Sequence, residues 1–324
     1  MKKLVPISRL KPDTEIQGFY LCKEKHLRNT RSGELFVDVV LSDSTGSVGA
    51  KIWQNVNKLS QRFEKGHAVA VRGRVEIFQE KKQILINRIN KATGARYARY
   101  GFKPEKLVLS SPYNPEKMWS SIGEVINKIE NPYLKRLIWQ LYKKHKKRLI
   151  IMPASLSMHY TYRSGYLEHI LSMSRIAIPF ARHYKADVDL LISGVFLHGI
   201  GKLVEFTDSM IPEFSDRGSF LGHSVLSRDM VVNEARKIKN FPSELLLQVE
   251  HLIVTHEGGF RSGYDYRGKT KEALLLQVLD SLDAKMSVLK KLLSEDVEQG
   301  KWTNKRNYFG TSFYKNETKE SDKS

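Results

Sequence analysis

Apolar and polar residues alternate in short stretches over the N-terminal third of the chain, and turn-forming residues separate these stretches. The second stretch is the clearest, because the residues of one face are all apolar: Leu35, Val37, Val39 and Leu41. Side chains two positions apart share a face of a strand. The pattern therefore predicts five strands, at 14–23, 34–41, 47–53, 67–78 and 83–89.

A short helix is predicted between the third and fourth strands, at 55–63. Five strands with a helix after the third follow the plan of the OB barrel. We therefore predict an N-terminal OB-like β-barrel over residues 1–99, with an unrelated small β-domain as the alternative.

The pattern becomes helical further along the chain, where apolar residues recur at three- and four-residue spacing. Residues 100–115 are rich in Pro and Gly and are expected to form a linker. The predicted helices are 116–129, 133–146, 166–184, 186–197, 222–239, 243–255 and 271–293. We expect an all-α domain over 116–310 and a polar, disordered tail over 311–324.

The composition adds a strong positive charge. The chain has 54 Lys and Arg residues against 35 Asp and Glu residues, a formal net charge of +19. This excess favours a polyanionic partner, because each neutralised phosphate releases counterions; a merely solubilising surface is the alternative. The single cysteine, Cys22, fits a reducing compartment. With no long apolar run and no secretion signal, we expect a cytoplasmic protein that has no membrane partner.

Three predicted helices carry a polar residue where packing alone favours an apolar one. His169 shares a helix face with Ile170 and Met173, His198 ends an apolar helix, and Asp280 interrupts another. A buried carboxylate without a partner costs several kcal/mol, so Asp280 requires a cation or hydrogen-bond donors. One metal ion would satisfy all three side chains.

Each of these residues also has a structural explanation. A His on an apolar face is often a hydrogen-bonded core residue, and Asp280 could cap a helix or pair with an Arg. The combination with His223 and His256, which lie between the helices in sequence, favours a metal site.

The same residues resemble a known motif. His169 and the phrases at 197–202 and 280–285 resemble the HD superfamily of metal-dependent phosphohydrolases, whose pattern is a His, a His-Asp pair and a later Asp. The phrases at 162–169, 222–223, 255–258 and 280–286 are closer to the YhaM-type 3′-to-5′ exoribonucleases. That family also places an OB-type domain before its HD domain. The resemblance covers nearly the whole chain except the tail.

The resemblance implies a two-metal site. The implied metal ligands are His169, His198, His223, His256 and Asp280. Mixed His and carboxylate ligands suit Mn²⁺ or Fe²⁺ better than Mg²⁺, and the resemblance implies divalent Mn²⁺ as the cofactor. Lys202 takes the place of the motif lysine and would contact a phosphate oxygen; a solvated cation at a helix end is the alternative. His251 is a ligand, an outer partner of a ligand or a purely structural residue.

One catalytic position departs from the motif, because the His-Asp pair reads His198-Gly199. In two-metal HD sites that Asp bridges the ions, and glycine supplies no ligand. We therefore expect weaker metal binding with reduced occupancy, and a higher pKa for metal-bound water. Gly199 is either an engineered substitution or a natural decay of the site, and the intact Gly201-Lys202 ending favours the first.

The OB-like domain is expected to bind a single strand, with aromatic side chains stacking on bases and Lys or Arg following the phosphates. The candidates are Phe19, Phe36, Lys51, Trp53, Arg72 and Phe78. Each aromatic residue could instead belong to the barrel core. The expected partner is single-stranded RNA, with single-stranded DNA as a further option and a homo-oligomer left open.

We interpret the chain as a metal-dependent 3′-to-5′ exoribonuclease that Gly199 impairs. One alternative is a catalytically inert protein that binds single-stranded nucleic acid. Another is a nucleotide phosphohydrolase, which would need neither the OB-like domain nor the high charge. No Gly-rich phosphate loop, Ser nucleophile elbow or CxxC pair is present, so ATPase, α/β-hydrolase and zinc-ribbon functions lack support.

Overall fold

The computed structural model describes residues 4–258, 260–261, 264–265 and 267–315. The chain divides into two compact units. One unit contains the chain up to Ser110 together with Phe206–Glu213, and the other contains Ser111–Glu205 and the chain from Phe214 onward.

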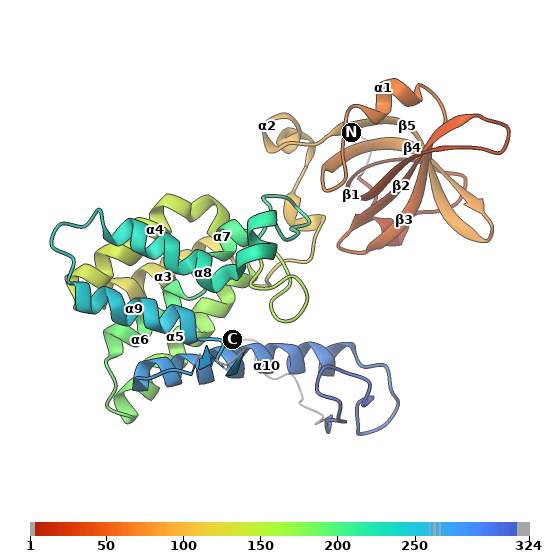
Figure 1. The fold of residues 1–324 in the computed structure, drawn as a ribbon. Helices are drawn as coiled ribbons and strands as arrows, with labels where there is room; N and C mark the ends of the chain where they lie inside the picture. Colours follow the sequence, from red (N-terminus) through yellow and green to blue (C-terminus); the bar gives the residue numbers. More distant parts are fainter. Residues whose placement is uncertain (1–3, 259, 262–263, 266, 316–324) are drawn as a thin grey trace. The chain divides into compact units, whose positions relative to one another are not determined.

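The first unit is built on a closed five-stranded barrel with the strand order β1-β2-β3-β5-β4 (Figure 1). The strands are β1 Glu15–Asn29, β2 Leu35–Asp43, β3 Gly46–Ile52, β4 Ala68–Phe78 and β5 Lys81–Lys91. Neighbouring strands are antiparallel except β3 and β5, which are parallel. A 3-10 turn, η1 (Ile7–Arg9), precedes β1, and helix α1 (Val56–Ser60) lies between β3 and β4 in the sequence. The predicted OB-like barrel is confirmed.

The apolar face predicted for β2 points into the barrel. Val37, Val39 and Leu41 are fully buried in its core. Strand β1 is longer than predicted, because its register shifts between Cys22 and Glu24 and its second half continues along β2. Most side chains of this second half are exposed, so no alternation of apolar and polar residues marked it in the sequence.

Part of the segment expected to be a linker packs against the barrel. After β5 come helix α2 (Gly94–Tyr97) and two 3-10 turns, η2 (Ala98–Tyr100) and η3 (Pro104–Lys106). Phe102 and Leu107 are buried in a cluster beside the main core. Proline and glycine exclude long helices from this segment, but they do not prevent its apolar side chains from packing.

The second unit is helical (Figure 1). Its helices are α3 Pro115–Asn127, α4 Pro132–Leu149, α5 Gly165–His183, α6 Val188–Leu197, α7 Lys202–Glu205, α8 Asp216–Ala235, α9 Ser243–Thr255 and α10 Lys271–Glu295. A two-stranded ribbon, β6 (Phe260–Arg261) and β7 (Tyr264–Asp265), precedes α10. Helix α8 begins earlier than predicted, at a cap formed by Ser215, and kinks at Gly222.

Asparagine caps fix where α3 and α4 begin. The Asn114 side chain accepts hydrogen bonds from two backbone N–H groups of α3, and Asn131 does the same for α4. The residue after each cap is proline, at the first helical position, where no N–H is needed. The predicted helices began one residue later because they placed these prolines outside.

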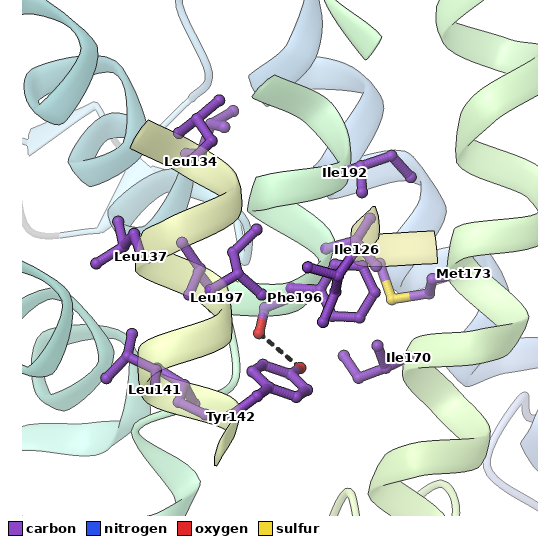
Figure 2. Packing of buried hydrophobic residues seen from close by; sticks show 14 of the residues in the cluster. Ile126, Leu134, Leu137, Leu141, Tyr142, Ile170, Met173, Ile192, Phe196 and Leu197 are labelled. Carbon is purple, nitrogen blue, oxygen red and sulfur yellow. Dashed lines mark hydrogen bonds between the residues drawn. The ribbon is translucent and has the colours of Figure 1, made fainter. Parts of the chain in front are cut away.

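The core of the helical unit fixes α4, α5 and α6 against one another. Figure 2 shows Leu137 and Leu141 of α4, Ile170 of α5 and Phe196 of α6, all buried in one cluster. Tyr142 is also buried, and its hydroxyl donates a 2.9 Å hydrogen bond to the carbonyl of Phe196. Burying each such side chain contributes about 1.5–3 kcal/mol. The packing thereby fixes α5, which carries His169, and α6, which His198 directly follows.

The structure describes the first residues of the expected tail, up to residue 315. Tyr314 pairs with Trp302 in an isolated β-bridge, and their rings lie 5.3 Å apart. Aromatic contacts of this kind stabilise a chain segment despite its polar composition. Residues 316–324 lie outside the described part of the chain. None of the described helices is both long and apolar enough to cross a membrane.

Candidate metal centre and nucleic-acid interface

His169 is a fully buried residue of α5 whose ring is oriented by a carboxylate. Its Nδ1 lies 2.8 Å from Oδ2 of Asp283 on α10, and the other oxygen of Asp283 accepts a hydrogen bond from Ser172. Because the carboxylate accepts, Nδ1 carries the ring proton and Nε2 presents a lone pair. That lone pair faces Oδ1 of Asp280 at 3.2 Å.

His198 directly follows α6, and a backbone carbonyl orients its ring in the same way. Its Nδ1 lies 2.9 Å from the carbonyl oxygen of Val195, so its Nε2 is the free lone pair and lies 3.8 Å from Oδ1 of Asp280. The Nε2 atoms of His169 and His198 are both buried without a hydrogen-bond partner. Two lone pairs and a carboxylate oxygen repel one another unless a cation lies between them. This first cluster, His169, His198 and Asp280, fits a divalent metal ion, and its ligand atoms lie within 4.8 Å of one another.

A second cluster consists of His223, His256 and Glu257. Nδ1 of His256 lies 2.7 Å from the carbonyl oxygen of Ile253, which turns its Nε2 toward Nε2 of His223 at 3.2 Å. Oε1 of Glu257 lies 3.7 Å from the same His223 nitrogen. The convergence of two imidazoles and a carboxylate again suits a divalent cation.

The two clusters are neighbours. The rings of His198 and His256 lie 4.9 Å apart between their centroids. The kink of α8 at Gly222, where φ is +70°, comes immediately before His223. There the backbone N–H of His223 donates a 2.9 Å hydrogen bond to the carboxylate of Glu205. This bond fixes the position of His223 in the second cluster.

Gly199 contributes no ligand to either cluster. A Cβ atom at this position would lie 3.2 Å from Cε2 of Tyr166 and 3.7 Å from its hydroxyl oxygen. Tyr166 is fully buried, and its ring occupies the space next to the position of such a Cβ atom. An Asp side chain at position 199 therefore requires a shift of this ring by a few tenths of an ångström.

The pKa shifts in the first cluster also favour a cation between its side chains. Burial opposes ionisation of Asp280, but its interaction with His169 and with the other surrounding imidazoles lowers its pKa well below the ordinary value. Burial also opposes protonation of His169, yet Asp280 and Asp283 together raise its pKa. Burial lowers the pKa of His198. The carboxylate is therefore charged, and a proton or a metal ion is stabilised between it and His169.

The structure contradicts the interpretation of Lys202 as a solvated cation. Its side chain is 7% exposed, and its Nζ donates a 2.7 Å hydrogen bond to the carbonyl of Ala154. Burial lowers its pKa, while Asp280, Glu205 and Glu257 oppose the shift. The ammonium group is thus held inside the domain, under the influence of carboxylates from both clusters.

Two other histidines have clear positions. His159, in the loop between α4 and α5, has a ring 5.2 Å from that of His169, and both of its nitrogens are buried without a hydrogen-bond partner. Burial lowers its pKa to about 3. No periodic pattern marks this loop, so sequence reasoning missed the residue. His251 belongs to neither cluster, and its Nε2 accepts a hydrogen bond from the backbone of Lys269, which agrees with the structural alternative.

Asp283 was also missed as an orienting residue, although its spacing of three residues from Asp280 places it one helical turn away. Replacing Asp283 by Asn is expected to weaken divalent-metal binding about 10–100-fold, because the ring of His169 loses the acceptor that fixes its tautomer. Calorimetric titration with Mn²⁺ measures the effect. Asp229→Asn, a partly exposed Asp outside both clusters, is the control, and equal affinities of the two variants would contradict the orienting role.

On the barrel, four of the six predicted nucleic-acid-binding residues form one group, here the β2–β3 aromatic cluster: Phe36, Lys51, Trp53 and Phe78. The rings of Phe36 and Trp53 stack with centroids 4.6 Å apart. Nζ of Lys51 lies 5.0–5.7 Å from the three ring centroids. Phe78 is 51% exposed, whereas Phe36 is buried at 8% exposure, so its ring also packs as the core alternative describes.

The other two predicted residues lie elsewhere on the barrel. Phe19 makes edge contacts with Tyr97 and Phe102 at 5.6 and 5.1 Å. Arg72 lies in the same groove as Phe19, and its guanidinium is 3.5 Å from Glu15. The structure therefore separates the predicted surface into two parts.

The class of protein follows from these two features. The five-stranded barrel is an OB fold, and the helical domain with its two neighbouring clusters of His and carboxylate side chains is an HD domain. Comparison with family models agrees: residues 166–285 match the HD domain, and residues 24–92 match the OB-fold nucleic acid binding domain. The HD domain implies dependence on a divalent metal ion.

Over nearly its full length the chain is homologous to proteins named 3′-5′ exoribonuclease YhaM. It is 28% identical to the one from Halalkalibacterium halodurans over 305 residues, 93% of this chain and 92% of that protein. It is 26% identical to the one from Bacillus subtilis over 309 residues, 93% of this chain and 96% of that protein. The second OB-fold domain of replication protein A from Methanococcus maripaludis is 19% identical, with a TM-score of 0.24, covering 28% of this chain and 94% of that domain.

Proposed function

We propose that this chain is a metal-dependent 3′-to-5′ exoribonuclease whose turnover is impaired by Gly199. The observation that carries the proposal is the convergence of imidazole lone pairs and carboxylates in two adjacent clusters of an HD domain. The OB-fold domain, the net charge of +19 and the YhaM relatives support RNA as the substrate. The lone, buried Cys22 supports a cytoplasmic location.

The first cluster would hold one divalent ion and the second cluster another. Mixed imidazole and carboxylate ligands favour Mn²⁺ over Mg²⁺. When bound, such ions supply Lewis acidity that activates water near neutral pH and stabilises charge developing on the phosphodiester. Gly199 supplies no carboxylate that could bridge the two clusters, and this would account for impaired turnover.

The protein's own groups orient this site. Asp283 and the carbonyl of Val195 fix the tautomers of His169 and His198, so both Nε2 lone pairs point inward. The buried ammonium of Lys202 adds positive charge that favours the approach of a phosphate. On the barrel, the stacked rings of the β2–β3 aromatic cluster suit unpaired bases.

The test is degradation of single-stranded RNA labelled at its 5′ end, in the presence of Mn²⁺, by this chain and by Gly199→Asp. We expect Gly199→Asp to shorten the RNA progressively from its 3′ end and the original chain to do so far more slowly. Gly199→Asp combined with His198→Ala is the matched control and should be inactive. Because Tyr166 lies close, Gly199→Asp with Tyr166→Leu is a second variant that gives the new side chain room.

Gly199 itself favours a second candidate function, a single-stranded nucleic-acid-binding protein without catalysis. That function predicts binding of RNA by every variant and no shortening by either Asp variant. Such a result would overturn the exoribonuclease proposal.

A further inference from the structure

A groove of about 620 Å³ crosses the outside of the barrel on β1, β4 and β5, away from the strands that form most of the β2–β3 aromatic cluster. The segment after β5 forms its other wall, with Tyr97 and Tyr100. Four arginines line it: Arg72, Arg88, Arg96 and Arg99. None of the described residues that line this groove is acidic.

Two arginines of the groove repel each other across neighbouring strands, which costs free energy. Arg72 on β4 lies directly opposite Arg88 on β5, beside a register shift between Arg72 and Gly73. Like charges directly opposite one another destabilise an antiparallel pair. Glu15 at 3.5 Å offsets the charge of Arg72, but within the described chain Arg88 has no acidic partner. An anion bound between these guanidinium groups would remove the repulsion.

Aromatic rings alternate with the charges. The guanidinium of Arg96 lies 5.6 Å from the ring of Tyr97, and that of Arg99 lies 4.8 Å from the ring of Tyr100. Tyr100 is 43% exposed, so one ring is accessible from solvent. Cations next to accessible rings form the pattern that binds phosphates and unpaired bases together.

We propose that this arginine groove binds a second segment of single-stranded RNA, in addition to the segment that lies on the β2–β3 aromatic cluster. The proposal rests on the proposed function, because it extends the RNA path of the same substrate. Unpaired bases are required, since a base inside a duplex cannot stack on Tyr97 or Tyr100.

The experiment measures binding of a labelled oligouridylate to the full chain by fluorescence anisotropy at several salt concentrations, with chelator present to prevent turnover. Arg88→Ala/Arg99→Ala tests the groove. Lys51→Ala/Phe78→Ala tests the β2–β3 aromatic cluster. Arg175→Ala/Arg306→Ala removes two arginines outside the barrel and controls for net charge.

Arg88→Ala/Arg99→Ala is expected to weaken binding about tenfold and to reduce the slope of log affinity against log salt by about 1.4, since each lost phosphate contact removes about 0.7 for a single strand. The control variant should bind like the original chain. Photocrosslinking of thiouridine-containing RNA should label Tyr97 or Tyr100, and excess inorganic phosphate should not prevent the label.

If Arg88→Ala/Arg99→Ala binds like the control while Lys51→Ala/Phe78→Ala binds weakly, the groove proposal is wrong and the proposed function stands. Loss of the crosslink in inorganic phosphate would show a site for free phosphate and would also overturn the groove proposal. If the original chain binds no RNA, both proposals fail.

Discussion

Replacing Asp280 by Asn is expected to weaken Mn²⁺ binding at the first cluster by more than about 100-fold. This loss exceeds the loss of affinity of about 10–100-fold typical of a residue that only orients a ligand, as Asp283 does. Asp280 is the only carboxylate among the ligands of that cluster, and its Oδ1 faces the lone pairs of both His169 and His198. An Asn side chain presents an amide in its place, whose NH₂ donates to a lone pair and leaves no negative charge for a cation. The electron paramagnetic resonance signal of free Mn²⁺ during a titration measures the loss directly.

The same variant should remain folded without metal, because the amide satisfies one of the orphaned imidazole nitrogens. Thermal unfolding in chelator checks this. Asp229→Asn is the matched carboxylate-to-amide control and should bind like the original chain. Unchanged Mn²⁺ binding by Asp280→Asn would mean that the first cluster does not hold the ion.

Replacing Gly201 by Ala is expected to destabilise the helical unit by about 3 kcal/mol, the upper part of the usual range for overpacking. A Cβ at this position would lie 2.4 Å from the carbonyl oxygen of His223 and 2.4 Å from the backbone nitrogen of Ser227. Both are backbone atoms of α8, which cannot rotate away as a side chain can. The hydroxyl of Ser227 also accepts from the Gly201 N–H and donates to the carbonyl of His198, so a shift of α8 moves ligands of both clusters.

Urea unfolding followed by circular dichroism measures the loss of stability, and Mn²⁺ titration of the folded protein should show weaker binding. Gly49→Ala is the control, because a Cβ there meets nothing within 4 Å. A Gly201→Ala protein as stable as this control would contradict the close approach of the backbone at Gly201, between α6 and α7, to α8.

The barrel could be predicted because one face of each strand is buried. Alternation is visible wherever that holds, as in the fully buried Val37 and Val39. It disappears in the second half of β1, which is mostly exposed, and in the segment that contains Phe102 and Leu107. Phe102 and Leu107 are buried by contacts with parts of the chain that are distant in sequence. Such contacts leave no periodic pattern in the sequence.

The candidate site could be predicted where a polar residue interrupts an apolar helix, as His169, His198 and Asp280 do. Glu257 and His159 could not be found in this way, because each lies where no periodic pattern makes a polar residue unexpected. Their positions follow from how the chain segments approach one another. On the barrel, residue type alone could not separate Phe19 and Arg72 from the β2–β3 aromatic cluster, since both sets combine rings with cations.

The ligands of the first cluster come from α5, α6 and α10, and α10 is the last of the described helices. A ribosome makes the chain from its N-terminus at about 5–20 residues per second, so α10 is made after α5 and α6. A growing chain that has not reached α10 holds both imidazoles but neither Asp280 nor Asp283, so it lacks the negative charge that retains a divalent ion. An ion at the first cluster would therefore be retained only after α10 has been made and has folded against α5. The choice among the metals of the cell would then be made by a folded site of fixed geometry, rather than by a nascent chain that would bind whichever metal histidine holds most tightly.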